Sequence, residues 1–244
     1  MSHMKGIHVS FDIVDEFIPR VPRQRCPGED ETVPRICVAE DILNAVNAVP
    51  QAGLVMENMK SLGLPVVIHA YYLTGEGMGK EEVQNYVPDA KLTGEFWLTE
   101  KPREVRRVDY EIVDFTTETV KDPFGHDLTA VVIISFNKCE YQDNVENFLH
   151  SMNGCGDVSK ERMERARKIF KEYSFRTVIS NIGDLITKNG DAITKKIREK
   201  RNLRVLLQTV DKVLRETSVS RSIFLCVYEI YSENRKFSLG LCHP

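Results

Sequence analysis

The sequence lacks the short motifs by which several enzyme classes are recognised. It contains no GxSxG, no P-loop and no HExxH, so a serine hydrolase elbow, a phosphate-binding loop and a zinc protease helix are not indicated. Its histidines also lack the spacing of three or four residues that places two metal ligands on one face of a helix. No metal site is therefore predicted.

Long apolar runs and clustered cysteines are missing as well. No apolar stretch approaches the roughly 18 residues that span a bilayer, so we expect no membrane-spanning segment. The six cysteines lie far apart without a CxxC pair, and Cys37 and Cys226 fall within apolar, strand-like runs. Isolated cysteines of this kind are typical of buried, reduced thiols. The sequence therefore predicts a cytoplasmic protein without a membrane partner.

The chain carries little net charge but distributes it unevenly. The formal net charge of its 244 residues is −3, whereas residues 159–216 hold 16 Lys and Arg against 8 Asp and Glu, a local charge of +8. Such a segment can contact nucleic-acid phosphates, which makes nucleic-acid binding through residues 158–216 one alternative function. The pattern favours a plainer interpretation, in which these residues form solvated helices or pack against the acidic remainder.

Periodicity predicts an α+β protein whose N-terminal unit, residues 5–115, holds a mixed, split sheet. The expected elements are a strand at 7–13, a strand at 35–38, helices at 40–50 and 53–62, a strand at 65–73, and a hairpin of 93–98 with 105–115. Residues 74–92 are expected to form a connection, because their GxGxG spacing lacks the third glycine and the helix of a dinucleotide fingerprint.

A second, helix-rich unit is predicted for residues 128–244. Turn-forming residues 116–127 mark the boundary. A buried strand at 129–136 and four helical segments between about 142 and 216 follow, and a β-hairpin of 222–231 with 236–241 closes the unit.

Polar residues gather on the predicted strands and on one loop of the first unit. Pro19, Pro22 and Pro27 fix the backbone between residues 18 and 28, so this arginine-rich stretch should be an ordered loop at a sheet edge. The candidate site residues are His8, Ser10, Arg20, Arg23, Arg35, Tyr71 or its neighbour Tyr72, and Glu95.

The order of these features resembles that of the ADP-ribosyltransferase fold over residues 5–115. The resemblance rests on a first strand with His8-x-Ser10, an apolar strand that leads directly into a helix, and a later Thr93-Gly-Glu95. Members of that family bind NAD across a split sheet. The resemblance implies that this chain binds NAD as a substrate and transfers ADP-ribose to a macromolecular acceptor, or cleaves NAD.

The same resemblance implies roles for individual residues. His8 would hold the nicotinamide ribose, and Glu95, the catalytic carboxylate, would orient the ribose and stabilise its oxocarbenium-like transition state. Ser10 and Tyr71 would complete the cofactor-binding surface. Arg20, Arg23 and Arg35 would bind the pyrophosphate of this dinucleotide, or of another phosphorylated ligand.

Structural interpretations of the same residues remain open at this point. Glu95 can be a solvated hairpin carboxylate paired with Lys91 or Lys101. The loop arginines can be neutralised by Glu29, Asp30 and Glu31, and His69 can be a satisfied core histidine. If these interpretations hold, the protein is a non-enzymatic interaction module.

Overall fold

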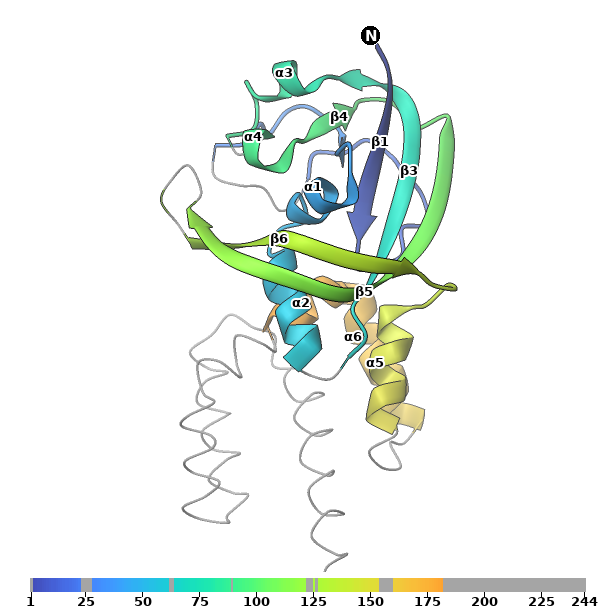
Figure 1. The fold of residues 1–244 in the computed structure, drawn as a ribbon. Coiled ribbons are helices and arrows are strands. Elements are labelled where there is room, and N and C mark those ends of the chain that lie inside the picture. Colours follow the sequence, from blue (N-terminus) through green and yellow to red (C-terminus); the bar gives the residue numbers. More distant parts are fainter. Residues whose placement is uncertain are drawn as a thin grey trace, which may run out of the picture. The chain divides into compact units, whose positions relative to one another are not determined.

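The computed structural model describes residues 2–22, 28–61, 64–88, 90–121, 125, 127–153 and 160–181. The chain divides into two compact units, Met1–Asn144 and Val145–Pro244. The fold is α+β, as the sequence predicts (Figure 1). The predicted limit of the first unit at residue 115 lies inside a strand, and residues 127–138, expected in the second unit, pair with that strand in the first.

Six strands of the described residues form one antiparallel sheet in the first unit. They are β1 (Ser2–Ser10), β2 (Ile36–Val38), β3 (Val67–Met78), β4 (Phe96–Leu98), β5 (Glu104–Lys121) and β6 (Asp127–Lys138). The order is β2-β4-β3-β5-β6. The remaining strand, β1, lies outside this order and also pairs with β3.

Four strands close into a small ring. Beyond the ladders of β1 with β3, β3 with β4 and β4 with β2, backbone bonds join β1 to the residue after β2. The Ile7 amide donates to the Ala39 carbonyl over 2.8 Å, and the Ala39 amide donates back over 2.9 Å. The ring leaves little space inside, because a Cβ on Gly6 would lie only 2.8 Å from the Cβ of Val38.

Helices of the first unit pack beside this sheet. They are α1 (Ile42–Asn47), α2 (Ala52–Ser61), α3 (Lys80–Val83) and α4 (Ala90–Thr93). Asp41 caps α1 by accepting the Asn44 amide hydrogen, as its position before the apolar stripe predicts. α1 contacts β1 and β6, α2 contacts β6, and the β5–β6 hairpin crosses these helices (Figure 1).

Two predictions for the middle of this unit were wrong. Residues 74–78 are not a connection but the last part of β3, where Gly77 lets the backbone of β4 come close: a Cβ there would lie 1.8 Å from the Trp97 carbonyl oxygen. Residues 93–98 and 105–115 form no hairpin, because β4 pairs with β2 and β3, whereas β5 pairs with β3 and β6. Both errors concern pairing between distant segments, which local patterns do not determine.

In the second unit the predicted helices at about 142–152 and 158–173 are confirmed as α5 (Asn144–Asn153) and α6 (Lys160–Tyr173). Phe148 and Phe170 pack edge to face at 5.3 Å, and Arg167 forms a two-pronged ion pair with Glu146. The predicted hairpin at 222–241 and most of the basic segment lie outside the described residues. Across the described ranges no helix is long and apolar enough to cross a membrane.

Candidate functional site

Six polar side chains form two rows on one face of three neighbouring strands. In the register of β1 with β3 and of β3 with β5, directly paired residues share a face. One row crosses the sheet through His8, Tyr71 and Arg107, and the other through Ser10, His69 and Asp109. We call this set, His8, Ser10, His69, Tyr71, Arg107 and Asp109, the polar face.

The row through His69 is held by a buried hydrogen bond. His69 Nδ1 lies 2.9 Å from Asp109 Oδ1, and both residues are buried, with exposed fractions of 0% and 5%. Because the carboxylate can only accept, Nδ1 carries the shared hydrogen. The other ring nitrogen, Nε2, is buried and has no hydrogen-bond partner among the described residues.

The row through Tyr71 reaches the surface at both ends. Tyr71 itself is buried, and its hydroxyl accepts the Val14 amide hydrogen over 2.8 Å. Arg107 lies beside it, 3.3 Å from Asp109 Oδ1, with its side chain 31% exposed and its guanidinium 4.1 Å from the centre of the Tyr141 ring. At the other end, His8 is half-buried, and the Phe17 ring packs against both His8 and Tyr71.

His8 fills a gap between β1 and β2. Its Nδ1 lies 2.9 Å from the Cys37 carbonyl oxygen, between the backbone bridge of Ile7 with Ala39 and that of Arg20 with Arg35. A carbonyl can only accept, so Nδ1 must donate, and Nε2 of the neutral ring is an acceptor. No described residue forms a hydrogen bond with His8 Nε2. This atom is also not among the fully buried ones that lack a partner, so it retains some access to solvent.

Burial and a nearby charge keep His8 neutral. Burial lowers the pKa of His8 below its ordinary value of 6.5, Arg20 lowers it further, and the bond to Cys37 opposes the shift. Arg20 is exposed, and no carboxylate among the described residues pairs with it. The acceptor nitrogen of His8 and the Arg20 cation, which has no carboxylate partner among the described residues, therefore lie near one another.

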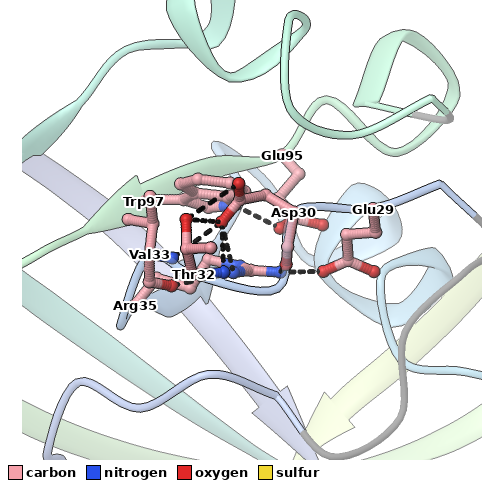
Figure 2. A network of polar contacts seen from close by, with 7 residues as sticks. All are labelled: Glu29, Asp30, Thr32, Val33, Arg35, Glu95 and Trp97. Atoms are coloured by element: carbon pink, nitrogen blue, oxygen red, sulfur yellow. Dashed lines mark hydrogen bonds and ion pairs between the residues drawn. The ribbon is translucent and has the colours of Figure 1, made fainter.

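The other face of the ring carries a different polar group, the Arg35 cluster, which consists of Glu29, Asp30, Thr32, Val33, Arg35, Glu95 and Trp97 (Figure 2). Two lines of strand register show that the Arg35 cluster and the polar face lie on opposite sides of the sheet. Through the bridge of Ile7 with Ala39, Cys37 and Trp97 lie on the face opposite to His8. Through β3, Met78 pairs with Trp97, whereas Tyr71, an odd number of residues away, points to the other side.

Arg35 is the centre of this cluster and is fully enclosed. Its exposed fraction is 2%, its guanidinium forms an ion pair with Glu29 and donates to the carbonyls of Asp30 and Val33, and it stacks 4.2 Å over the Trp97 ring. The loop is fixed by Asp30, which accepts amide hydrogens from Thr32 and Val33, and these bonds lower the pKa of Asp30. The two terminal nitrogens of the guanidinium are thus bound within the protein.

Glu95 also belongs to this enclosed face. Its exposed fraction is 7%, and its Oε1 accepts the Trp97 indole hydrogen over 2.6 Å, as Figure 2 shows. Burial first, and then the Glu95 charge, raise the pKa of the neighbouring Cys37 thiol. The interpretation of Glu95 as a solvated hairpin carboxylate is wrong, and Lys101 pairs with Glu16 instead.

The structure brings together only part of the site that the sequence predicts. His8, Ser10 and Tyr71 lie on the polar face. Arg20 is bridged to Arg35 and so begins on the opposite face, but it lies near enough to His8 for its charge to lower the pKa of that ring. Arg35 and Glu95 lie on the opposite face. Arg23 is outside the described residues.

Sequence reasoning missed three members of the polar face. Arg107 and Asp109 lie two residues apart in a long strand, and this spacing alone indicated that they share a face. His69 was interpreted as a satisfied core histidine; it is in the core, but only one of its two nitrogens has a partner. That Asp109 faces His69 follows from the register of β3 with β5, which the sequence does not state.

Three comparisons with known proteins bear on the family of this chain. None of the family models, the curated proteins or the solved structures gave a match.

Proposed function

We propose that this chain is an ADP-ribosyltransferase-like protein that binds a nucleotide of the NAD class at the His8 end of the polar face. The observation that carries the proposal is that a neutral His8, whose tautomer is fixed by the Cys37 carbonyl, lies near the cation of Arg20, which has no carboxylate partner among the described residues. These two groups match the two polar parts of a dinucleotide, its ribose hydroxyls and its pyrophosphate.

His8 suits a ribose hydroxyl. A hydroxyl donates one hydrogen bond, and His8 Nε2 is an acceptor as long as the ring is neutral. The lowered pKa of His8 keeps the ring in that form at neutral pH. The ring is also held in place on both sides, by the Cys37 carbonyl and by the Phe17 ring at 5.3 Å, so little freedom remains to be lost on binding.

The charge of this end suits a pyrophosphate. Of the charged groups on and beside the polar face, Asp109 is already held by His69 and Arg107, which leaves the Arg20 guanidinium without a counter-ion among the described residues. A fork of N–H donors binds two phosphate oxygens at once. The backbone bridge of Arg20 with Arg35 fixes where this side chain begins.

The resemblance assigns transfer of ADP-ribose to a carboxylate at Glu95, but Glu95 lies on the face opposite to His8, so our proposal covers binding of the nucleotide and not its transfer. In our proposal binding does not require Glu95, because its carboxylate is held by Trp97 on the opposite face. We propose a cytoplasmic location as well, which agrees with the free thiols of Cys37 and Cys139.

The experiment is a melting curve of the full chain with and without NAD. A ligand that binds only the folded state stabilises it by RT ln(1 + [L]/Kd), about 2.7 kcal/mol at a hundredfold excess over Kd, which raises the melting temperature by a few degrees. We expect this shift for the wild-type chain and its loss in Arg20→Ala.

Arg103→Ala is the matched control. Arg103 is an exposed arginine of the same unit that pairs with Glu76, far in sequence from His8 and outside the polar face. Its substitution removes the same charge but should leave the NAD shift in place. A wild-type melting curve that does not move at millimolar NAD would refute the proposal. If both arginine variants lose the NAD-induced shift equally, the shift reflects non-specific attraction of NAD to positive charge and not a site at Arg20.

A further inference from the structure

The second row of the polar face has the chemistry of a nucleophile with its base. Ser10, His69 and Asp109 stand on β1, β3 and β5, which are adjacent, and they are paired in register. The order is hydroxyl, imidazole, carboxylate, with Asp109 bound to Nδ1 and the imidazole between the other two. Such sets are recognised by geometry and roles rather than by sequence position.

We infer that Ser10 is a nucleophile activated by His69, which Asp109 holds in place, and that its substrate is an ester. This inference goes beyond nucleotide binding and does not depend on it. It joins three observations: the in-register row, the bond of Asp109 to Nδ1, and the buried Nε2 without a partner.

The unpartnered nitrogen is the strongest of these observations. A buried polar atom without a hydrogen bond destabilises the folded state, so such atoms are rare in folded proteins. The bond to Asp109 places the hydrogen on Nδ1 and makes Nε2 of the neutral ring a base. A hydroxyl is the partner this nitrogen lacks.

Ser10 can supply that hydroxyl. Directly paired residues of antiparallel strands have Cβ atoms about 4.5–5.5 Å apart, so a serine opposite a histidine is within reach of the imidazole by a side-chain rotation. Ser10 Oγ accepts the Asp12 amide hydrogen over 3.0 Å, which fixes one lone pair and leaves the hydroxyl hydrogen free to donate. Ser10 is half-buried at the end of β1, whereas His69 is sealed.

The step balances without a further reactant. Ser10 Oγ forms a bond to the ester carbonyl carbon while its proton passes to His69 Nε2. The C–O bond of the ester then breaks, and the alcohol leaves with that proton. Water hydrolyses the acyl-serine by the same route and releases the carboxylic acid.

A fluorophosphonate probe tests the inference on the full, folded chain. The serine oxygen displaces fluoride from phosphorus, and the added mass is located by peptide mass spectrometry. We expect one label per chain, on Ser10, with none in Ser10→Ala and none in urea-unfolded protein. Ser135→Ala, which removes an exposed serine on β6, should label like the wild type.

Variants of the other two residues separate catalysis from folding. General base catalysis contributes about 10²–10⁴-fold, so His69→Gln should slow labelling of Ser10 at least a hundredfold while the circular dichroism spectrum is kept. Asp109→Asn should slow it too, and Asp109→Glu should partly restore it.

Several outcomes would overturn the inference. They are an unlabelled folded wild type, a label on another serine, or equal labelling of Ser10 in the folded and unfolded chain. If His69→Gln does not fold, the wild type, Ser10→Ala and the unfolded chain still decide between these outcomes.

Discussion

His8 and Glu95 approach the same residue, Cys37, from opposite faces of the sheet. The His8 ring donates to the Cys37 carbonyl, and the Glu95 carboxylate acts on the Cys37 thiol. Each is fixed by its own neighbours, Phe17 for His8 and Trp97 for Glu95. One small ligand therefore cannot contact both His8 and Glu95 without opening the strand pair.

The first prediction concerns the pH dependence of folding stability. The pKa of His8 is lower in the folded state than its ordinary value of 6.5, so the unfolded state binds more protons as the pH falls below about 6.5. Stability from His8 is therefore complete above that pH and is lost progressively below it. His8→Asn keeps a donor near the position of Nδ1 but does not titrate. We expect its free energy of unfolding in urea to change less than that of the wild type between pH 7.5 and 5.5; an identical change in both would contradict this account.

The second prediction concerns the buried arginine. Arg35→Met removes the buried guanidinium that forms an ion pair with Glu29 inside the Arg35 cluster. Breaking such a pair costs about 3–5 kcal/mol. Arg103→Met is the control, because the Arg103 side chain is 64% exposed in its pair with Glu76, and it should cost no more than about 1 kcal/mol. Urea unfolding measures both, and a cost for Arg35→Met as small as that of the control would contradict the structural role.

The third prediction concerns the glycines at the end of β3. Gly77→Ala would place a Cβ 1.8 Å from the Trp97 carbonyl oxygen, and the backbones of β3 and β4 would have to separate. Overpacking costs about 1–3 kcal/mol or more, and we expect the upper end here because the obstacle is backbone. Gly79→Ala meets its nearest atom, on Met4, at 4.0 Å and should be nearly neutral. The melting temperatures of the two variants test this prediction, and we expect that of Gly77→Ala to be clearly lower. Similar melting temperatures would show that the backbones of β3 and β4 are not this close at Gly77.

Local patterns were sufficient for some elements and not for others. The apolar run before Val38 and the capping Asp41 predicted β2 and α1, because each depends on neighbours in sequence. The end of β3 was missed because Gly77 is needed by a strand that lies twenty residues further along the chain. Strand pairing is set by packing between distant segments, which a single sequence does not reveal.

The candidate site shows the same limit. The sequence indicated His8, Ser10 and Tyr71 because polar residues are conspicuous in apolar strands, and the structure places them on one face. The sequence did not show that Arg35 is paired inside the protein and that Arg20, among the described residues, is not, although the acids that pair with Arg35, Glu29 and Asp30, are near it in the sequence. It also could not join Asp109 to His69, forty residues away, because that contact exists only in the register of β3 with β5.

The central claim is that NAD binds on the face of His8 and not on the face of Glu95, and calorimetric titration of NAD into His8→Asn and Glu95→Gln tests it most directly. His8→Asn lacks the Nε2 acceptor, and the loss of one hydrogen bond should weaken binding about tenfold. Glu95→Gln keeps an oxygen that can accept the Trp97 hydrogen bond, so its Kd should stay within about twofold of the wild type. The opposite result, in which Glu95→Gln weakens binding about tenfold or more and His8→Asn leaves it unchanged, would contradict the account.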